Sequence, residues 1–367
     1  MIDNIIRSYN FGAGPSMLPT EIILKIQREL LNWNNTGVSI LEIGHRTSEV
    51  QELIANVEVK LRKVMQIPNN YKVLFMHGGA QGQFSGIPMN LTRHNHTADY
   101  MISGLWSQKA ATAAKKYVDV NIIFDDVVDS LPDIASWQKK LNPNASYLYY
   151  CPNETITGIR FPFIPTSANV PLVADMTSLI LSESIDVNKF GLIFAAVQKN
   201  LGVAGNTVVI VRDDLLNQRL DITPEIWNYT LLANSNSTVN TIVVLAIYIM
   251  DLMLDWLINL GGVEAMELIN LKKAHKLYDY IDSSKLYYNT IKDDYRSIMN
   301  VSFNLHNHQN PHNNLLQKFL LEASNNNLLY IKGHASVGGC RASLYNAMPE
   351  SGVDALIKFM QEFEFNN

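Results

Sequence analysis

Lys199 is the residue of this sequence that is best placed to do covalent chemistry. It follows the apolar run 192–197 and Gln198, and it precedes a turn that contains Gly202 and Gly205. A lysine at the end of a buried strand is costly to keep charged, and desolvation frees its amine to attack carbonyl groups. An ordinary solvated strand end would also fit this pattern, so the interpretation needs a second group.

Asp175 supplies that second group. It ends the apolar run 170–174 and stands 24 positions before Lys199. An amine and a carboxylate at the ends of two buried strands suit pyridoxal phosphate, which forms a Schiff base with a lysine and needs an acidic partner at its pyridine nitrogen. The pair therefore favours a pyridoxal phosphate site, with the solvated strand end as the alternative.

The elements that must position these two residues are predicted by the pattern of apolar residues. Helical spacing is clear from Ile22 to Leu30 and from Val50 to Val64. Apolar runs typical of strands occur at 72–76, 146–150, 170–174, 192–197 and 207–211. Strands that alternate with helices indicate an α/β fold with a largely parallel sheet.

The pattern changes near residue 265. An amphipathic helix is expected over 266–281, and apolar and polar residues alternate over 299–305, as in a half-exposed antiparallel strand. The sequence therefore predicts a large domain over 16–265. A smaller α+β domain is expected over 266–367, joined by the N-terminal segment 1–15.

Composition narrows the class of protein. A chain of 367 residues exceeds one usual hydrophobic core, and 47% hydrophobic with 17% charged residues is typical of a globular protein. A net charge of −5 and a pI near 6.0 argue against a nucleic acid as the main partner. Only Cys151 and Cys340 occur, which fits a reducing cytosol, and the N-terminus lacks the features of a signal peptide. We expect a cytoplasmic protein.

An apolar stretch resembles a membrane span. The runs 242–250 and 252–260 are almost continuous, but Asp251 and Asp255 interrupt them. The uninterrupted part is too short to cross a bilayer, so we expect a buried helix at a domain or subunit boundary, with no membrane partner.

Histidines gather in one polar segment. His306, His308 and His312 lie among Asn and Pro residues, without a carboxylate or a thiolate nearby, and His94 and His96 have similar neighbours. Turn-forming residues dominate, so we expect a solvated loop and no metal site.

The glycine-rich segment 77–83 follows an expected strand. It is neither a G-x-G-x-x-G fingerprint nor a P-loop, because it lacks the spacing of the first and the final Lys of the second. Either a phosphate-binding turn of another type or a plain strand-to-helix turn fits it.

In order, the motifs of this chain resemble those of the phosphoserine aminotransferase family of class-V, pyridoxal-phosphate-dependent enzymes. The resemblance covers nearly the whole chain. It implies a fold-type-I transferase, whose large domain has a mostly parallel seven-stranded sheet flanked by helices. The motifs are FGAGPSMLP (11–19), GHR (44–46), HGG (77–79), GQF (82–84), CPNET (151–155), AVQKN (196–200), NT (240–241) and GGCRASLYNAMP (338–349).

The resemblance implies roles for the residues around the cofactor. Lys199 would hold pyridoxal phosphate as a Schiff base and shuttle the substrate proton, while Asp175 would keep the pyridine nitrogen protonated. Trp106 would stack on the ring, and Thr155 would bond its phenolic oxygen. The cofactor phosphate would be held by Ala80, Gln81 and Gln198, with Asn240 and Thr241 contributed by a second subunit.

The resemblance also implies the reaction. The enzyme would transfer an amino group reversibly between L-glutamate and 3-phosphohydroxypyruvate, giving O-phospho-L-serine and 2-oxoglutarate in serine biosynthesis. Arg341 would bind the α-carboxylate, and His45, Arg46 and His334 would bind the substrate phosphate. The expected assembly is a homodimer with shared active sites. Whether the chain also acts on 4-phosphohydroxy-L-threonine, in pyridoxine biosynthesis, is left open.

The sequence departs from the family in three places, one of which covers two residues. Gln81 stands where an arginine is frequent, and Ile242 and Val243 stand where prolines commonly follow Asn240–Thr241. Ala335 replaces an arginine, which removes a charge-assisted contact of about 1.5–3 kcal/mol. Lys332 could supply the missing positive charge. The alternative is that the chain is another class-V aminotransferase with an altered substrate.

Three other classes of protein fit the sequence less well. Glyoxylate-type aminotransferases have no need for the His45, Arg46 and His334 cluster. A desulfurase needs a mobile cysteine, and neither Cys151 nor Cys340 is placed for that role. A non-catalytic protein of the same fold is disfavoured by Lys199, Asp175 and Arg341.

Overall fold

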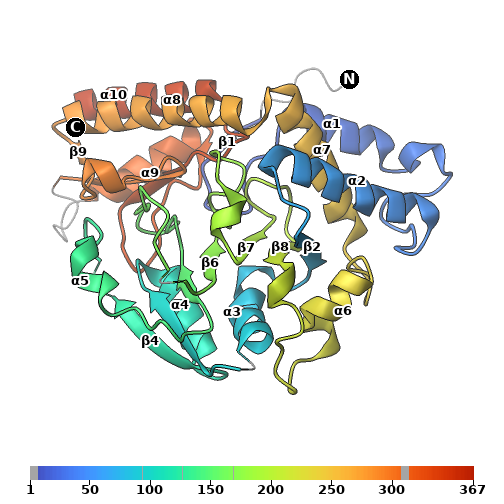
Figure 1. The fold of residues 1–367 in the computed structure, drawn as a ribbon. Helices are drawn as coiled ribbons and strands as arrows, with labels where there is room; N and C mark the ends of the chain where they lie inside the picture. The colour runs from blue at the N-terminus through green and yellow to red at the C-terminus, as the bar shows by residue number, and fades with distance from the viewer. Residues whose placement is uncertain (1–6, 93, 126, 168, 307–313) are drawn as a thin grey trace.

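A seven-stranded sheet forms the centre of the structure. The structure, a computed structural model, describes residues 7–92, 94–125, 127–167, 169–306 and 314–367 (Figure 1). The strand order is β2-β8-β7-β6-β5-β3-β4, and only β8 runs antiparallel to its neighbours. The mostly parallel α/β sheet is confirmed. Its strands are β2 (Tyr71–Met76), β3 (Thr97–Met101), β4 (Asp119–Phe124), β5 (Leu148–Tyr150), β6 (Leu172–Asp175), β7 (Leu192–Ala196) and β8 (Thr207–Arg212).

Helices cover both faces of this sheet, because successive side chains of each buried strand point to opposite faces. In β7, Leu192 and Phe194 belong to one core cluster and Ile193 and Ala195 to another. The first cluster packs against α3 (Gly79–Leu91), α4 (Leu105–Ala114) and α6 (Tyr229–Asn234), and the second against α2 (Ser48–Met65) and α7 (Val244–Asn259).

The C-terminal part has its own core around a small antiparallel sheet in the order β12-β10-β9. Phe11 and Met17 belong to this core, and β1 pairs in parallel with β11. Helices α8 and α10 lie side by side over it, at the top of Figure 1. The elements are β1 (Tyr9–Asn10), α8 (Gly262–Ser283), β9 (Tyr287–Tyr288), β10 (Asn300–Leu305), α9 (Leu315–Asn325), β11 (Leu328–Leu329), β12 (Cys340–Ser343) and α10 (Glu350–Asn366).

The alternation expected over 299–305 is the strand β10, and the helix expected over 266–281 lies within α8. The division of the chain at residue 265 falls in the first turn of α8, and it stays a prediction. The remaining elements are short: α1 (Thr20–Glu29), α5 (Ile134–Gln138), and the 3₁₀ turns η1 (Trp33–Asn35), η2 (Val187–Lys189), η3 (Asp213–Leu215), η4 (Glu225–Trp227) and η5 (Asp293–Tyr295).

The apolar stretch after residue 242 forms α7, which is largely buried. Asp251 and Asp255, which interrupt it, both pair with Lys60 of α2, at 2.8 and 2.7 Å. Within the described residues no single helix combines the length and the apolar character that a bilayer span requires. Only α7 and α8 taken together do, and they are bent by 81°.

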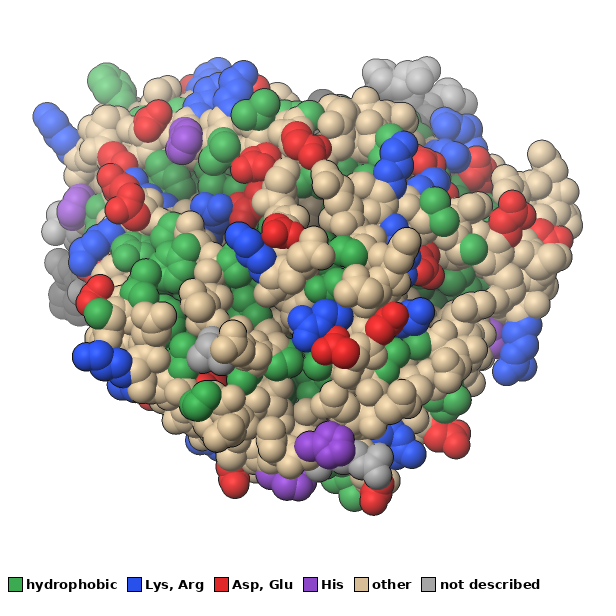
Figure 2. All heavy atoms as spheres, in the orientation of Figure 1, with side chains coloured by type: hydrophobic (Ala, Val, Ile, Leu, Met, Phe, Trp, Pro, Cys, Tyr) green, Lys and Arg blue, Asp and Glu red, His purple; other side chains and the backbone are tan. Residues whose placement is uncertain are grey.

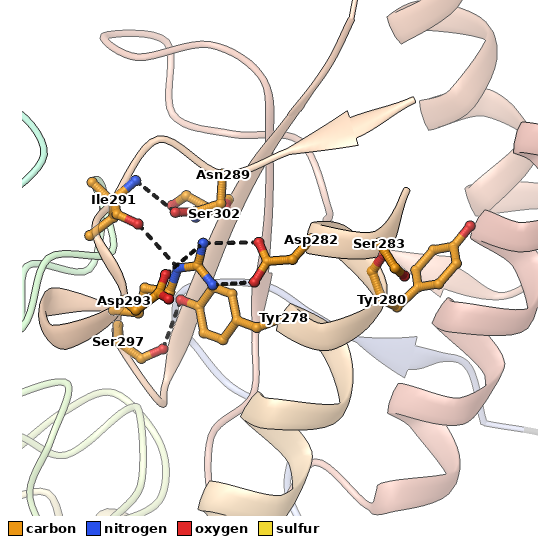
Figure 3. A network of polar contacts seen from close by, with 10 residues as sticks. Tyr278, Tyr280, Asp282, Ser283, Asn289, Ile291, Asp293, Ser297 and Ser302 are labelled. Carbon is orange, nitrogen blue, oxygen red and sulfur yellow. Dashed lines mark hydrogen bonds and ion pairs between the residues drawn. The ribbon is translucent and has the colours of Figure 1, made fainter. Parts of the chain in front are cut away.

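A polar network connects Tyr278 and Asp282 of α8 to the segment that precedes β10, where Ser297 lies (Figure 3). The Arg296 guanidinium bonds both carboxylate oxygens of Asp282, and it lies 4.8 Å from the ring centroid of Tyr278. The backbone next to Arg296 also contacts the part of the chain that contains the seven-stranded sheet, since the N–H of Arg160 donates to the carbonyl of Tyr295 at 2.8 Å. The network therefore holds the C-terminal unit against the turn that follows Thr155.

Charges on the visible surface are mixed. On the face shown in Figure 2, acidic and basic side chains are interspersed and form no large field of one sign. Of the segment expected to be a histidine-rich loop, His308 and His312 lie outside the described residues. His306 is described, and its ring stacks on Tyr288 at 4.5 Å.

Candidate active site

A cavity of about 280 Å³ lies at the carboxyl ends of β6 and β7. This is the edge of a parallel sheet at which α/β proteins place their ligands. Seven of the residues expected to bind the cofactor line it together: Ala80, Gln81, Trp106, Thr155, Asp175, Gln198 and Lys199. The sheet therefore brings the predicted amine and carboxylate to one cavity.

Lys199 is buried, with 7% of its surface exposed. Its Nζ donates a hydrogen bond of 2.7 Å to Oγ1 of Thr155 and lies 5.8 Å from the ring centroid of Tyr345. The N-terminal motif packs behind it: Ser16 donates from its hydroxyl to the carbonyl of Lys199, and from its N–H to the carbonyl of Gln198 at 2.9 Å. The amine is thus shielded from bulk water but has a polar neighbour inside the cavity.

Asp175 is the buried acid of the cavity. Its Oδ1 accepts a hydrogen bond of 3.0 Å from the N–H of Thr177. Burial raises the pKa of the Asp175 carboxyl, while hydrogen bonds from Thr177 and the charge of Lys199 oppose that rise. A desolvated carboxylate of this kind is stabilised by a protonated ring nitrogen placed against it.

Two glycines shape the wall of the cavity at the start of α3. Gly78 and Gly79 have φ of 91° and 62°, in the left-handed region that favours glycine. A Cβ on Gly78 would also lie 2.6 Å from the ring of Trp227. In the described part of the chain no side chain caps the start of α3, so its first backbone N–H groups are available to an anion at this wall.

Trp106 forms another wall, and it is half-buried at the start of α4. Its Nε1 is buried and lacks a hydrogen-bond partner among the described residues. Glu154, fully buried, accepts a hydrogen bond from the N–H of Trp106. Glu154 therefore fixes the backbone that carries the ring.

Further residues line the cavity that were given no role from the sequence: Cys151, Asn153, Thr177 and Ser178, together with the two glycines. Cys151 and Asn153 belong to the motif that carries Thr155, while Thr177 and Ser178 directly follow Asp175. Because these residues follow the ends of parallel strands, where α/β proteins bind ligands, their position in the sequence could have identified them as site residues.

Arg341 approaches the cavity through Thr155. It lies on β12, is 9% exposed, and its Nη1 donates to the carbonyl of Thr155 at 3.4 Å. Burial lowers the pKa of the Arg341 guanidinium. Its Nε is buried without a partner in the described part of the chain, so the guanidinium retains a free donor.

The other predicted residues do not line this cavity. His45 and Arg46 lie in the connection before α2, where Arg46 is exposed and Nε2 of His45 is buried without a described partner. The carbonyl of Thr241, next to Asn240, lies 2.9 Å from Nε2 of His77, just before the glycine turn. Within a single chain, none of these four residues lines the cavity.

His334 lies on an exposed loop between β11 and β12. Its Nδ1 accepts a hydrogen bond of 3.1 Å from the N–H of Ser336, and the hydroxyl of Ser336 is 2.7 Å away. Nδ1 is therefore occupied as an acceptor, which leaves Nε2 to present a proton outward. Ala335 and Lys332 are exposed on the same loop.

The comparisons with known proteins agree with this geometry. Residues 8–356 match the family model described as aminotransferase class-V. The chain is 47% identical over 364 residues to the phosphoserine aminotransferase of Hahella chejuensis, covering 98% of this chain and 99% of that one. It is 48% identical over 362 residues to that of Acinetobacter baylyi, with the same coverage.

Solved structures are similar over the same length. The pyridoxal-phosphate-bound phosphoserine aminotransferase of Trichomonas vaginalis is 39% identical, with a TM-score of 0.93 over 97% of this chain and 100% of that one. The enzyme from Bacillus circulans subsp. alkalophilus is 38% identical, with a TM-score of 0.93 over 98% and 99%. An alanine–glyoxylate aminotransferase from Nostoc, at 15% identity and a TM-score of 0.79, shares the fold.

Proposed function

The chain belongs to the class-V aminotransferases and, within them, to the phosphoserine aminotransferase family, and from this premise we propose how its residues carry the reaction. It is a pyridoxal-phosphate-dependent transaminase. It exchanges an amino group between L-glutamate and 3-phosphohydroxypyruvate, with O-phospho-L-serine and 2-oxoglutarate as products, a step of serine biosynthesis. The observation that carries the site assignment is that Lys199 and Asp175, on adjacent strand ends, are buried in one cavity.

The residues of the cavity fit the cofactor. When bound, pyridoxal phosphate supplies an aldehyde carbon for amines and a ring that withdraws electrons. Asp175, whose burial raises its pKa, would keep the ring nitrogen protonated. Trp106 would cover a ring face, and the Thr155 hydroxyl, which accepts from the Lys199 amine, keeps its own proton to donate to the phenolic oxygen. The backbone at Ala80 and Gln81, together with the side chain of Gln198, would hold the phosphate, since all three residues line the cavity.

Lys199 also moves the substrate proton. Its amine is sequestered from bulk water, so a proton taken from the substrate α-carbon is returned within the site and not lost to solvent. Arg341 orients the substrate through its α-carboxylate, which a planar guanidinium binds bidentately. Its orphaned Nε supports this role, because a buried donor without an acceptor is costly until a ligand supplies one.

The remaining residues support a homodimer with shared sites. His45, Arg46, Asn240 and Thr241 stay outside the cavity of one chain. We therefore propose that they complete the site of a second copy, Asn240 and Thr241 at the cofactor phosphate, His45 and Arg46 with His334 at the substrate phosphate. Sedimentation of the purified protein tests the dimer, and a monomer with full activity would contradict it.

The proposed compartment is the cytoplasm, since both cysteines are buried, free thiols. Burial raises the pKa of both thiols, which also argues against a desulfurase that attacks with a cysteine. For the proposed link to pyridoxine biosynthesis, turnover of 4-phosphohydroxy-L-threonine is the direct assay.

The cofactor assignment is tested by reduction with borohydride. The purified protein should be yellow, and borohydride should fix the chromophore to Lys199, as peptide mapping would show. Lys199→Ala should lose the fixed chromophore after denaturation. If the variant keeps the colour to the same extent, the assignment of Lys199 is wrong.

Substrate specificity is tested by comparing kcat/KM for O-phospho-L-serine with that for L-serine. A site that binds phosphate through His45, Arg46 and His334 should prefer the phosphorylated amino acid by at least about 100-fold, because several charge-assisted contacts are lost without it. Equal values would contradict a phosphate-specific site.

A further inference from the structure

A buried carboxylate holds the first turn of α4. Glu154 is 0% exposed, and its Oε2 accepts from the N–H of Trp106 at 3.1 Å. Its Oε1 accepts from the N–H of Ser107 at 3.0 Å and from the Ser107 hydroxyl at 2.6 Å. Backbone N–H groups of a first helical turn have no acceptor within the helix, and a negative charge is favourable there. One side chain therefore bonds two of these N–H groups at once.

The turn before α4 is fitted closely around this carboxylate. An added Cβ on Gly104 would lie 2.6 Å from Cδ of Glu154, so the position has room only for glycine. The hydroxyl of Ser107 accepts from the N–H groups of Ser103 and Gly104, at 2.9 and 3.1 Å, while it donates to Glu154. The backbone position of Trp106 is thus coupled to the position of Glu154.

An ordinary helix start is capped by a short polar residue next to it in sequence. Here the residue before α4 is Gly104, and the acceptor comes from 48 positions beyond Trp106. Burial raises the pKa of Glu154, against hydrogen bonds from Ser107 and Trp106 that lower it. Burying a carboxylate to cap a helix is energetically costly. We therefore expect the connection that Glu154 makes between its own turn and the start of α4 to serve a further role.

The turn that contains Glu154 also contacts Lys199. Glu154 is fixed by backbone hydrogen bonds to Ile159 and Gly158, at 2.8 and 2.9 Å. The next residue, Thr155, accepts from the Lys199 amine. Glu154 does not itself line the cavity, so it acts on the site through its neighbours.

We propose that Glu154 is a positioning residue that fixes the Trp106 ring against the bound cofactor by bonding the first turn of α4. The proposal rests on the proposed function, in which Trp106 covers a face of the pyridoxal phosphate ring. In this role, Glu154 fixes the start of α4, which carries Trp106, relative to the turn that carries Thr155, whose hydroxyl lies beside Lys199.

The test is Glu154→Gln in the full-length protein. Glutamine keeps the size of the side chain, but its NH₂ group cannot accept from an N–H, so one bond to the helix is lost. The dissociation constant of pyridoxal phosphate should rise about tenfold, equivalent to about 1.4 kcal/mol. The induced circular dichroism of the bound cofactor should weaken. In the cofactor-free protein, hydrogen exchange at the amides of Trp106 and Ser107 should accelerate.

A double-mutant cycle separates positioning from general stability. If Glu154 acts through the ring, Glu154→Gln should change cofactor affinity by less than about twofold when Trp106→Ala is already present. Asp99→Asn is the matched control, because Asp99 is also fully buried and accepts from Asn142 N–H and an Asn121 amide, outside the cavity. That variant should lose stability and keep the wild-type cofactor affinity.

Two outcomes overturn the proposal. One is an unchanged cofactor affinity and dichroism in Glu154→Gln, and the other is an equal effect in the Trp106→Ala background. If Glu154→Gln fails to fold, Ser107→Ala provides the same readouts with the carboxylate intact, and wild-type values there count against the proposal. Borohydride fixation on Lys199 in the wild type distinguishes the two hypotheses. If no chromophore is fixed to Lys199, the proposed function is wrong, and not only the role of Glu154.

Discussion

The amine of Lys199 donates a 2.7 Å hydrogen bond to the hydroxyl of Thr155, which follows the buried Glu154 in sequence. In this short turn, Thr155 contacts the Lys199 amine and Glu154 contacts the helix that carries Trp106. Since Arg341 bonds the carbonyl of the same threonine, this turn is where the proposed cofactor and substrate groups meet.

Replacing Thr155 by Val should weaken cofactor binding. The variant keeps the shape of the side chain but removes the hydroxyl, and the loss of one hydrogen bond should raise the dissociation constant about tenfold. Titration of the cofactor-free protein with pyridoxal phosphate measures it. Thr155→Ser, which keeps the hydroxyl, should stay within about threefold of wild type. Equal affinities of the Val and Ser variants would show that the hydroxyl does not bind the cofactor.

Ala335→Arg should improve binding of the phosphorylated substrate. The added guanidinium beside His334 supplies a charge-assisted contact, so KM for O-phospho-L-serine should fall about tenfold or more while cofactor affinity stays unchanged. Steady-state kinetics measure KM, and Ala335→Gln controls for size without charge. No fall in KM would indicate that another cation, such as Lys332, already occupies that position.

Gly104→Ala should destabilise the protein. The backbone of Gly104 is extended, with φ of 175°, so the cost is steric and comes from the 2.6 Å approach to Glu154. Overpacking of this kind should lower the free energy of unfolding by about 2 kcal/mol, as urea unfolding would measure. Gly44→Ala is the control, because an added Cβ there meets only Thr47, at 3.7 Å. If both variants are equally stable, the fit around Glu154 is looser than the distances imply.

Lys273 should make stability depend on pH. It is fully buried on α8, and its Nζ donates to the carbonyls of Leu344, Tyr345 and Met348 at 3.0–3.1 Å. Burial lowers the pKa of Lys273 from 10.5 to about 7.

Between these two pKa values the unfolded chain binds a proton that the folded protein releases. The free energy of unfolding should therefore rise from about pH 7 toward pH 10, by about 1 kcal/mol per pH unit relative to Lys273→Met. Urea unfolding of both proteins at several pH values measures the difference. A parallel pH dependence of the two would contradict the lowered pKa.

The parts of the fold that the sequence predicted are those with uniform burial. The runs that became β6 and β7 are buried along their whole length, so their apolar character predicted both the strands and the placement of Asp175 and Lys199. The strands β3 and β4 carry no such signal. β4 is an edge strand with exposed and half-exposed positions, and β3 contains the buried, hydrogen-bonded Asp99.

The site was predicted less evenly. Glu154 could not be recognised from its neighbours, because its partners lie 47 and 48 positions away and only the fold brings them together. His45, Arg46, Asn240 and Thr241 entered through the family resemblance alone. Local sequence patterns report burial and turns, but not which distant polar groups will meet.

The parallel pairing of Tyr9 with Leu328 bears on how the chain is completed during synthesis. Tyr9 and Phe11 pack in the C-terminal core, whose other strands and helices emerge from the ribosome last. The N-terminal segment must therefore wait, without its partners, until almost the whole polypeptide has been translated. A nascent chain released before residue 328 would lack that closure, however well its central sheet had formed.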